Sequence, residues 1–209
     1  MSPVFTVPTN ITVAMTGASG ATFTRELLLA LERDRRVEKV NFIACDNALR
    51  VLAEELGIKG RSNLVQQLLG KGATGSRSKT VKTTQQNNAD IGANVASGSY
   101  PADAMVVIPC SMGTLASIAC GLASTLLVRA ADVCLKEQRP LILCVRETPL
   151  NKIHIENMRR AADAGATIFP LIPAFYNRPK TADEMAREFA ARVLQHLGLS
   201  QPDAYRWKG

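Results

Sequence analysis

A run of small residues, Thr16-Gly17-Ala18-Ser19-Gly20, stands between an apolar β-type segment (11–15) and a helix-forming segment (25–31). A strand that turns through such a run into a helix leaves backbone N–H groups of the first helical turn without partners. Those groups, the helix dipole and the Ser19 hydroxyl attract a phosphate. The glycines permit a close approach that a Cβ would prevent. The run predicts an anion-binding turn, and the alternative is a tight turn without a ligand.

Three further clusters of small or charged residues follow predicted strands. Ala44-Cys45-Asp46 ends the segment 39–44, Ser111-Met112-Gly113-Thr114 follows 104–109, and Arg146-Glu147 follows 141–145. In a parallel sheet, ligands bind at the carboxyl ends of the strands. We therefore expect these clusters to meet the glycine-rich run at one edge of the sheet.

Several other charged or aromatic residues have both a functional and a plain structural interpretation. Arg129 and Lys136 are seven apart on a predicted helix, with Asp132 between them, so the three share one face. That face is either a row of ion pairs or part of an anion site. Tyr176 follows the last predicted strand, and Arg192 lies on the final helix, where an exposed face is the ordinary interpretation.

Strands and helices alternate along the chain, which predicts an α/β fold with a doubly wound parallel sheet of about five strands. Residues 57–98 lose this periodicity and form an irregular insert, with a short helix at 64–69. We expect a single domain over 1–209 that ends in a tail at 198–209. The predicted strands are 11–15, 39–44, 104–109, 141–145 and 166–171, and the predicted helices are 25–36, 46–56, 115–138, 151–164 and 181–197.

Composition narrows the class of protein. The chain has 209 residues, 46% of them apolar, and no apolar run approaches the roughly 20 residues of a membrane span. Residues 1–10 lack the pattern of a signal peptide. Five cysteines without a C-x-x-C pair favour reduced thiols in a cytoplasmic protein. Two histidines make a histidine-based metal site improbable, so we expect no metal.

The net charge of +7 is concentrated in residues 56–89, which hold six basic side chains and no acidic one. Nucleic-acid binding would favour aromatic residues among those charges, and this stretch has none. We interpret it as a solvated segment and expect neither a nucleic acid nor a membrane as a partner.

An ordered series of motifs gives the chain a resemblance to the flavin prenyltransferases of the UbiX family across nearly its whole length. Each motif alone is weak, whereas the series with compatible spacing is specific. The matching stretches are 15–21 (MTGASGA), 96–99 (ASGS), 109–115 (PCSMGTL), 129–133 (RAADV), 135–137 (LKE), 146–149 (RETP), 153–158 (IHIENM), 173–176 (PAFY) and 206–207 (RW).

The resemblance implies a Rossmann-like or flavodoxin-like fold and an enzyme that works without a metal. It implies two substrates, reduced FMN and dimethylallyl phosphate, with the five-carbon unit joined to flavin N5 and C6. The product, prenylated FMN, would serve decarboxylases of the UbiD type. It further implies a homo-oligomer, a dodecamer built from trimers.

The resemblance also implies roles for individual residues. Three catalytic residues would be Glu54, Lys136 and Glu147, of which Glu147 assists the departure of the phosphate. The allylic phosphate would be bound by Lys136, Arg146, Tyr176 and Arg192, with Arg129 nearby and Trp207 closing over the site. FMN would be held by Gly17, Ala18, Ser19, Ala44, Ser111, Met112, Gly113, Thr114 and Arg146.

Two other functions stay open at this point. One is a flavoprotein that decarboxylates cysteinyl peptides or phosphopantothenoylcysteine, but that class needs a histidine soon after the first helix, and this chain has none before His154. The other is a flavin carrier without turnover. Ala44 favours a carrier, because the family usually has Ser or Thr there, whereas Lys136, Glu147, Tyr176 and Arg192 favour an enzyme.

Overall fold

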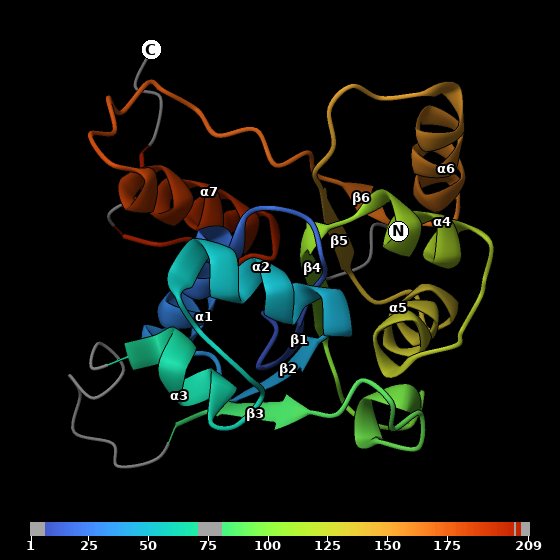
Figure 1. The fold of residues 1–209 in the computed structure, drawn as a ribbon. Helices are drawn as coiled ribbons and strands as arrows, with labels where there is room; N and C mark the ends of the chain where they lie inside the picture. Colours follow the sequence, from blue (N-terminus) through green and yellow to red (C-terminus); the bar gives the residue numbers. More distant parts are fainter. Residues whose placement is uncertain (1–6, 71–80, 203, 206–209) are drawn as a thin grey trace.

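Six parallel strands form one sheet in the order β3-β2-β1-β4-β5-β6 (Figure 1). The computed structural model describes residues 7–70, 81–202, 204 and 205. The order reverses between β1 and β4, and in such sheets this crevice at the carboxyl ends of the strands is where ligands bind. The strands are β1 Asn10–Met15, β2 Lys39–Ala44, β3 Thr83–Gln86, β4 Ala104–Cys110, β5 Leu141–Val145 and β6 Thr167–Ile168.

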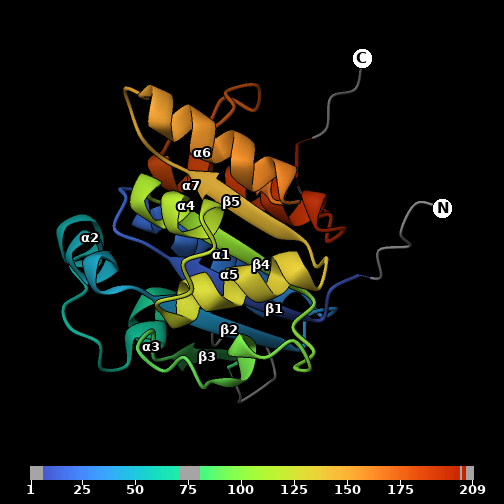
Figure 2. The same cartoon turned by 90° about the vertical axis from the view of Figure 1, so that its right-hand side faces the viewer.

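Helices cover both faces of the sheet (Figures 1 and 2). On one face α1 packs against α7, with α3 beside it, and on the other face lie α4, α5 and α6. Among the described residues, none of the helices has the length and apolar character needed to cross a membrane. The helices are α1 Ala21–Arg33, α2 Asp46–Leu56, α3 Leu64–Leu69, α4 Met112–Ala119, α5 Leu126–Lys136, α6 Lys152–Asp163 and α7 Ala182–His196, with a 3-10 turn, η2, at Asn94–Ala96.

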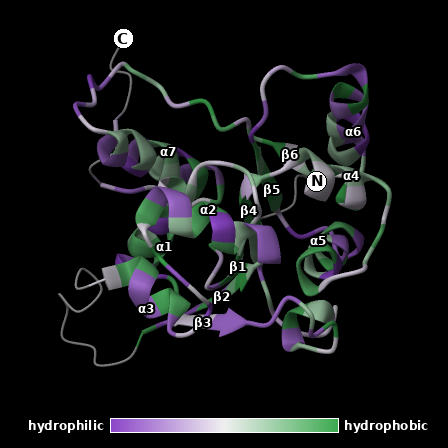
Figure 3. Cartoon of the chain, viewed as in Figure 1, coloured by the Kyte–Doolittle hydropathy of each residue, from purple (hydrophilic) through white to green (hydrophobic). Residues whose placement is uncertain are grey.

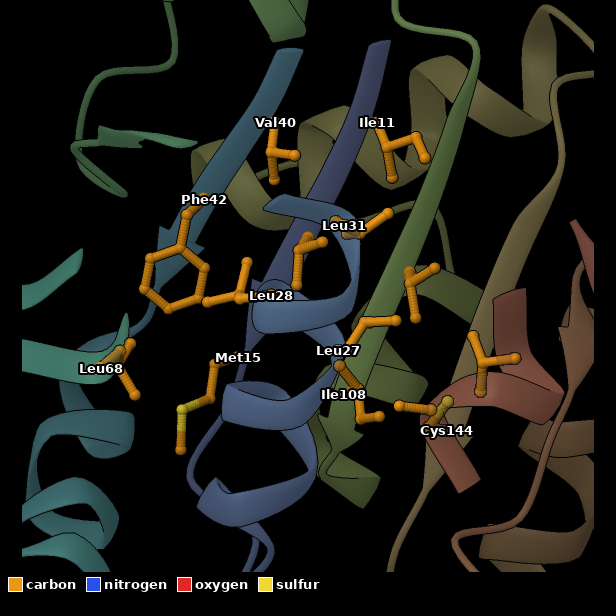
Figure 4. Packing of buried hydrophobic residues seen from close by; sticks show 14 of the residues in the cluster. Ile11, Met15, Leu27, Leu28, Leu31, Val40, Phe42, Leu68, Ile108 and Cys144 are labelled. Carbon is orange, nitrogen blue, oxygen red and sulfur yellow. The ribbon is translucent and has the colours of Figure 1, made fainter. Parts of the chain in front are cut away.

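The central strands are buried on both sides, so alternate residues feed two cores. Ile11, Phe42 and Ile108 point toward α1, where they meet Leu27 and Leu28 (Figure 4). Their strand neighbours belong to the second core, under α4, α5 and α6. Figure 3 shows the same arrangement as an apolar sheet between helices with hydrophilic outer faces. This pattern explains why continuous apolar runs in the sequence marked β1, β4 and β5.

The predicted helix 115–138 is wrong as a single element, because it consists of α4 and α5 separated by residues 120–125. Gly121 adopts a left-handed backbone (φ 68°) that ends α4, and Thr125 begins α5 from an extended conformation. Small helix-forming residues on both sides of the break hid it in the sequence. The break matters because it gives α5 its own amino end, beside Asn88, whose carbonyl accepts from Leu126 N at 2.9 Å.

Among the described residues the sheet has six strands, where the sequence predicted about five, because β3 lacks the hydrophobic periodicity on which the prediction relied. Its sequence, Thr-Thr-Gln-Gln, has no apolar residue, and the strand pairs only with β2 at the sheet edge. Glu32 on α1 accepts from Thr83 N and Oγ1 at 2.8 and 2.5 Å, so side-chain contacts fix this strand where burial cannot. β6 is shorter than the predicted 166–171, whereas the short helix at 64–69 is confirmed as α3.

Candidate functional site

The Thr16 side chain ties the end of β1 to the end of β4. Thr16 is fully buried, and its hydroxyl donates to the Pro109 carbonyl at 2.7 Å and accepts from Ser111 N at 2.8 Å. The glycine-rich run begins at the next residue, and the turn at 111–114 begins at Ser111. One hydroxyl therefore sets the relative position of the two turns predicted to form the site.

Pro109 explains why carbonyls at the end of β4 require side-chain hydrogen-bond donors. Proline has no N–H, and the register of β4 on β5 shifts between Val107 and Cys110, so the ladder is interrupted there. The Thr24 hydroxyl on α1 accordingly donates to the Ile108 carbonyl at 2.5 Å, and the Thr16 hydroxyl donates to the Pro109 carbonyl. Both carbonyls thus obtain partners that burial requires.

The amino end of α1 already holds an anion from the chain itself. The carboxylate of Glu55, near the end of α2, accepts from Gly20 N at 3.1 Å and from Ala21 N at 2.7 Å. These are among the N–H groups that the sequence assigned to a phosphate. Glu54, the predicted catalytic residue, is exposed, and its side chain makes no hydrogen bond to a described residue. The structure therefore brings Glu55, one position later, to the glycine-rich run.

Gly17 is required by the close approach of α2. A Cβ at this position would lie 2.5 Å from the Cβ of Asn47, a separation that real structures do not tolerate. Ala44 is buried at the end of β2. The next residue, Cys45, is half-buried and occupies the N-cap position of α2 without a side-chain capping bond. The contact between run 17–20 and α2 is thus made at the backbone, with little room between them.

The amino end of α4 forms the second turn. Ser111 is its N-cap, and its hydroxyl accepts from Thr114 N at 3.4 Å. A Cβ at Gly113 would have nothing within 4 Å, so this helix end faces open space. Unlike the start of α1, it has no carboxylate from a described residue, and its dipole remains available to an anion.

Arg146 and Glu147 lie at the same edge, directly after β5. Arg146 N donates to the Cys110 carbonyl at 3.0 Å, which places this pair beside the turn at 111–114. Both side chains are exposed. The structure therefore brings together the run 17–20, Ser111–Thr114, Arg146 and Glu147, as the sequence predicted.

A pocket of about 310 Å³ lies at the carboxyl end of β3. It is lined by Arg61, Gln85, Gln86 and Asn87, and Arg61 pairs with Asp46 at the start of α2. Residues with polar side chains thus continue along this edge as far as β3.

Lys136 does not join this group within one chain. It is the last residue of α5, which runs beside the sheet toward the edge where β1 begins (Figure 2). Lys136 and Glu147 are consequently separated by the length of β5, roughly 15–20 Å. Lys136 pairs with Glu137, lowering the pKa of that carboxyl, and a Cβ at Gly98 would lie 2.6 Å from its Nζ.

Arg129 lies on the same helix, two turns earlier. Its guanidinium pairs with Asp132 at 2.6 Å, and its Nε donates to the Ala96 carbonyl at 3.2 Å. The predicted shared face of Arg129, Asp132 and Lys136 is confirmed by the helix that carries them. These side chains border the loop 96–99 and form a second, separate basic group.

Tyr176 lies in the loop before α7, and Arg192 lies on α7, where its Nη1 donates to Gln195 Oε1 at 2.5 Å. The Tyr176 ring lies nearly parallel to Tyr205, with ring centroids 6.3 Å apart. Tyr205 N donates to Glu188, which precedes Arg192 by one helical turn and so shares its face. Trp207 lies outside the described residues. Tyr205 carried no signal in the sequence beyond its place in the tail.

No metal site is evident in the described part of the chain, where no three His, Cys, Asp or Glu side chains gather. Burial raises the pKa of the Cys110 thiol to about 12 and that of Cys144 well above its usual value. These thiols therefore stay protonated at neutral pH and act as small core residues.

A parallel sheet in this order, with two hydroxyl-rich turns at its carboxyl edge, defines a nucleotide-binding α/β protein of the Rossmann class. The Flavoprotein family model matches residues 5–189. Flavin prenyltransferase UbiX of Pseudomonas aeruginosa is 40% identical over 202 residues, which cover 96% of this chain and 94% of that protein.

Two solved structures agree. The AnUbiX structure, in complex with FMN and dimethylallyl pyrophosphate, has a TM-score of 0.83 and 38% identity and covers 97% of this chain and 98% of that one. A dodecameric FMN-dependent Ubix-like decarboxylase from Escherichia coli O157:H7 has a TM-score of 0.83 and 40% identity, with 96% and 100% covered. The chain belongs to the Flavoprotein family and, within it, to the UbiX flavin prenyltransferases.

Replacing Thr16 by Val should lower the free energy of unfolding by about 1–3 kcal/mol, because it leaves the part-buried Ser111 N–H unpaired and removes the hydroxyl bond to the Pro109 carbonyl, which keeps only the longer contact from Thr16 N at 3.3 Å. Urea titration measures the loss. Thr16→Ser keeps the hydroxyl and should recover most of it. A Thr16→Val protein as stable as the parent would contradict the role given to this side chain.

Replacing Glu55 by Gln should lower the free energy of unfolding by about 0.5–2 kcal/mol, because the amide brings no charge to the amino end of α1. Its neighbour provides the control, since Glu54→Gln alters an exposed carboxylate and should stay within about 0.5 kcal/mol of the parent. Equal losses in the two variants would show that the contact contributes nothing.

Proposed function

We propose that this chain transfers the dimethylallyl group of dimethylallyl phosphate to N5 and C6 of reduced FMN, giving prenylated FMN. The observation that carries the proposal is the meeting of the run 17–20, Ser111–Thr114 and Arg146–Glu147 at one sheet edge, in a chain 38% identical to a protein crystallised with FMN and dimethylallyl pyrophosphate. The proposal requires a binding site for the flavin, a binding site for the allylic donor, and residues that assist the departure of the phosphate.

The residues at the carboxyl edge fit FMN. We assign flavin contacts to Gly17, Ala18, Ser19, Ser111–Thr114 and Arg146. Because Glu55 occupies the start of α1, the flavin phosphate is better placed at the amino end of α4, where a Cβ at Gly113 would meet no atom within 4 Å. Cys45 replaces Ala44 as the residue at the end of β2 that faces the flavin, because Ala44 is buried.

The donor phosphate requires residues that one chain holds apart. Arg146 and Glu147 lie at the carboxyl edge, and Lys136 and Arg129 lie on α5. Tyr176 lies in the loop before α7, and Arg192 lies on α7. We infer that neighbouring subunits bring Lys136 to Glu147 in a homo-oligomer, with a dodecamer as the expected state. Large exposed apolar side chains near these elements support burial by other copies: Leu122, Leu150, Ile153 and Ile155.

The reaction breaks the allylic C–O bond, and phosphate leaves with the bonding electron pair. Fixed cations stabilise the charge that develops on the leaving group, a task for Lys136, Arg146 and Arg192. Glu147 passes a proton to the departing oxygen. Glu55, rather than Glu54, is the second carboxylate, because it alone of the two faces the glycine-rich run. Trp207 would exclude water from the allyl cation.

The test is direct. Reduced FMN is incubated with the protein and either dimethylallyl phosphate or dimethylallyl pyrophosphate, and the flavin is analysed by mass spectrometry. The expected product carries one added five-carbon unit. A bound but unchanged flavin would instead favour the carrier. A product that activates a UbiD-type decarboxylase would place the chain upstream of that class of enzyme.

Glu147→Gln should retain both substrates but slow turnover on the order of 10²–10⁴-fold, because the amide offers no transferable proton. Lys136→Ala should weaken donor binding as well as turnover, at a cost of about 1.5–3 kcal/mol for the lost charge-assisted contact. Rapid mixing with reduced FMN separates binding from chemistry. A Glu147→Gln enzyme that turns over at the parental rate would refute the proton transfer.

Co-expression of the two variants tests the shared site. If Lys136 of one subunit serves Glu147 of its neighbour, mixed oligomers regain intact sites, about a quarter of the total for equal, random mixing. If both residues act from one subunit, every site keeps one lesion and mixing restores nothing. The control is the same mixture assembled from separately folded, non-exchanging oligomers.

A further inference from the structure

The start of the carboxyl-terminal tail is fixed to the body of the protein. Leu199 is fully buried, and Gln201 Nε2 donates to Asp34 at the end of α1 at 3.1 Å. Arg36 pairs with the same carboxylate and also donates to the Ser200 carbonyl at 3.1 Å. Hydrogen bonds from Arg36 lower the pKa of Asp34 to about 2, so this anchor is charged at every physiological pH.

Tyr205 contacts α7 through Glu188. Its backbone N–H donates to Glu188 Oε2 at 3.4 Å, and its ring lies within 10° of parallel to the ring of Tyr176. Tyr176 itself is in the loop between β6 and α7 and is 69% exposed. Two segments distant in sequence, the 170–181 loop and the tail, therefore meet at these two rings.

A stacked partner limits the directions that an exposed tyrosine can take. Loss of a stacked partner widens the range of rotamers open to the Tyr176 ring, and that added freedom has to be given up when a ligand binds. The Tyr205 ring on which Tyr176 stacks belongs to a residue that contacts Glu188, one helical turn before Arg192 on α7, so the pair of rings lies beside the part of α7 that carries Arg192. Phenol and guanidinium together supply hydrogen-bond donors for one phosphate.

We propose that Tyr205 is a positioning residue for the allylic donor, acting through Tyr176. The proposal rests on the proposed function, which places Tyr176 against the donor phosphate. It goes beyond that function by assigning a role to Tyr205, a tail residue that precedes Trp207 in the chain. Stacking requires an aromatic ring at position 205 and makes no use of its hydroxyl.

Tyr205→Ala should raise the KM for dimethylallyl phosphate about three- to tenfold, the cost of ordering one side chain anew, with kcat and FMN affinity unchanged. Tyr205→Phe should match the parent. In a Tyr176→Ala background, Tyr205→Ala should add nothing. A tail that acts by itself, for example through Trp207, would instead give the same KM increase in both backgrounds and would overturn the proposal.

Fluorine NMR of protein labelled with fluorinated tyrosine provides a readout that does not depend on activity. The chain has three tyrosines, and single Tyr→Phe variants assign their signals. Tyr205→Ala should shift and narrow the Tyr176 signal, whereas the Tyr100 signal should stay unchanged. An unaltered Tyr176 signal refutes the positioning role. An inactive parent with the expected shift refutes only the proposed function.

Discussion

The arrangement of the candidate site depends on how the chain satisfies two carbonyls at the end of β4. Pro109 interrupts the hydrogen-bond ladder of β4. The Thr24 hydroxyl donates to the Ile108 carbonyl, and the Thr16 hydroxyl donates to the Pro109 carbonyl. Because the Thr16 hydroxyl also accepts from Ser111 N, this side chain joins the glycine-rich run to the amino end of α4. Buried polar groups that must be hydrogen-bonded thus fix the relative positions of the two turns at this edge, and these turns position the exposed residues of the site.

Distances along the strands impose the second constraint. A residue at the end of α5 and a residue after β5 lie at opposite ends of that strand, so no rearrangement of side chains within a chain joins Lys136 to Glu147. A site that uses both must be built between subunits. The same reasoning gives a function to the exposed apolar residues around α6, which a lone chain would leave in water.

Sequence reasoning succeeded where burial imposes a pattern and failed where single contacts decide. β1, β2, β4 and β5 were predictable because both faces are buried. β3 was not, since side-chain contacts with Glu32 hold its polar residues at an edge. Glu54 and Glu55 show the same limit at the site. Neighbours on a helix point about 100° apart, and the contacts with Gly20 N and Ala21 N distinguish Glu55 from Glu54.

The position of Glu55 also decides how anions are distributed over the edge. Two helix amino ends, those of α1 and α4, face the crevice, and each attracts negative charge. Glu55 neutralises the first from within the chain, so a phosphate gains most at the second, beside Arg146. A carboxylate that closes one of two similar sites thereby directs a charged ligand to the other, which is a form of selectivity that neither glycine-rich turn provides alone.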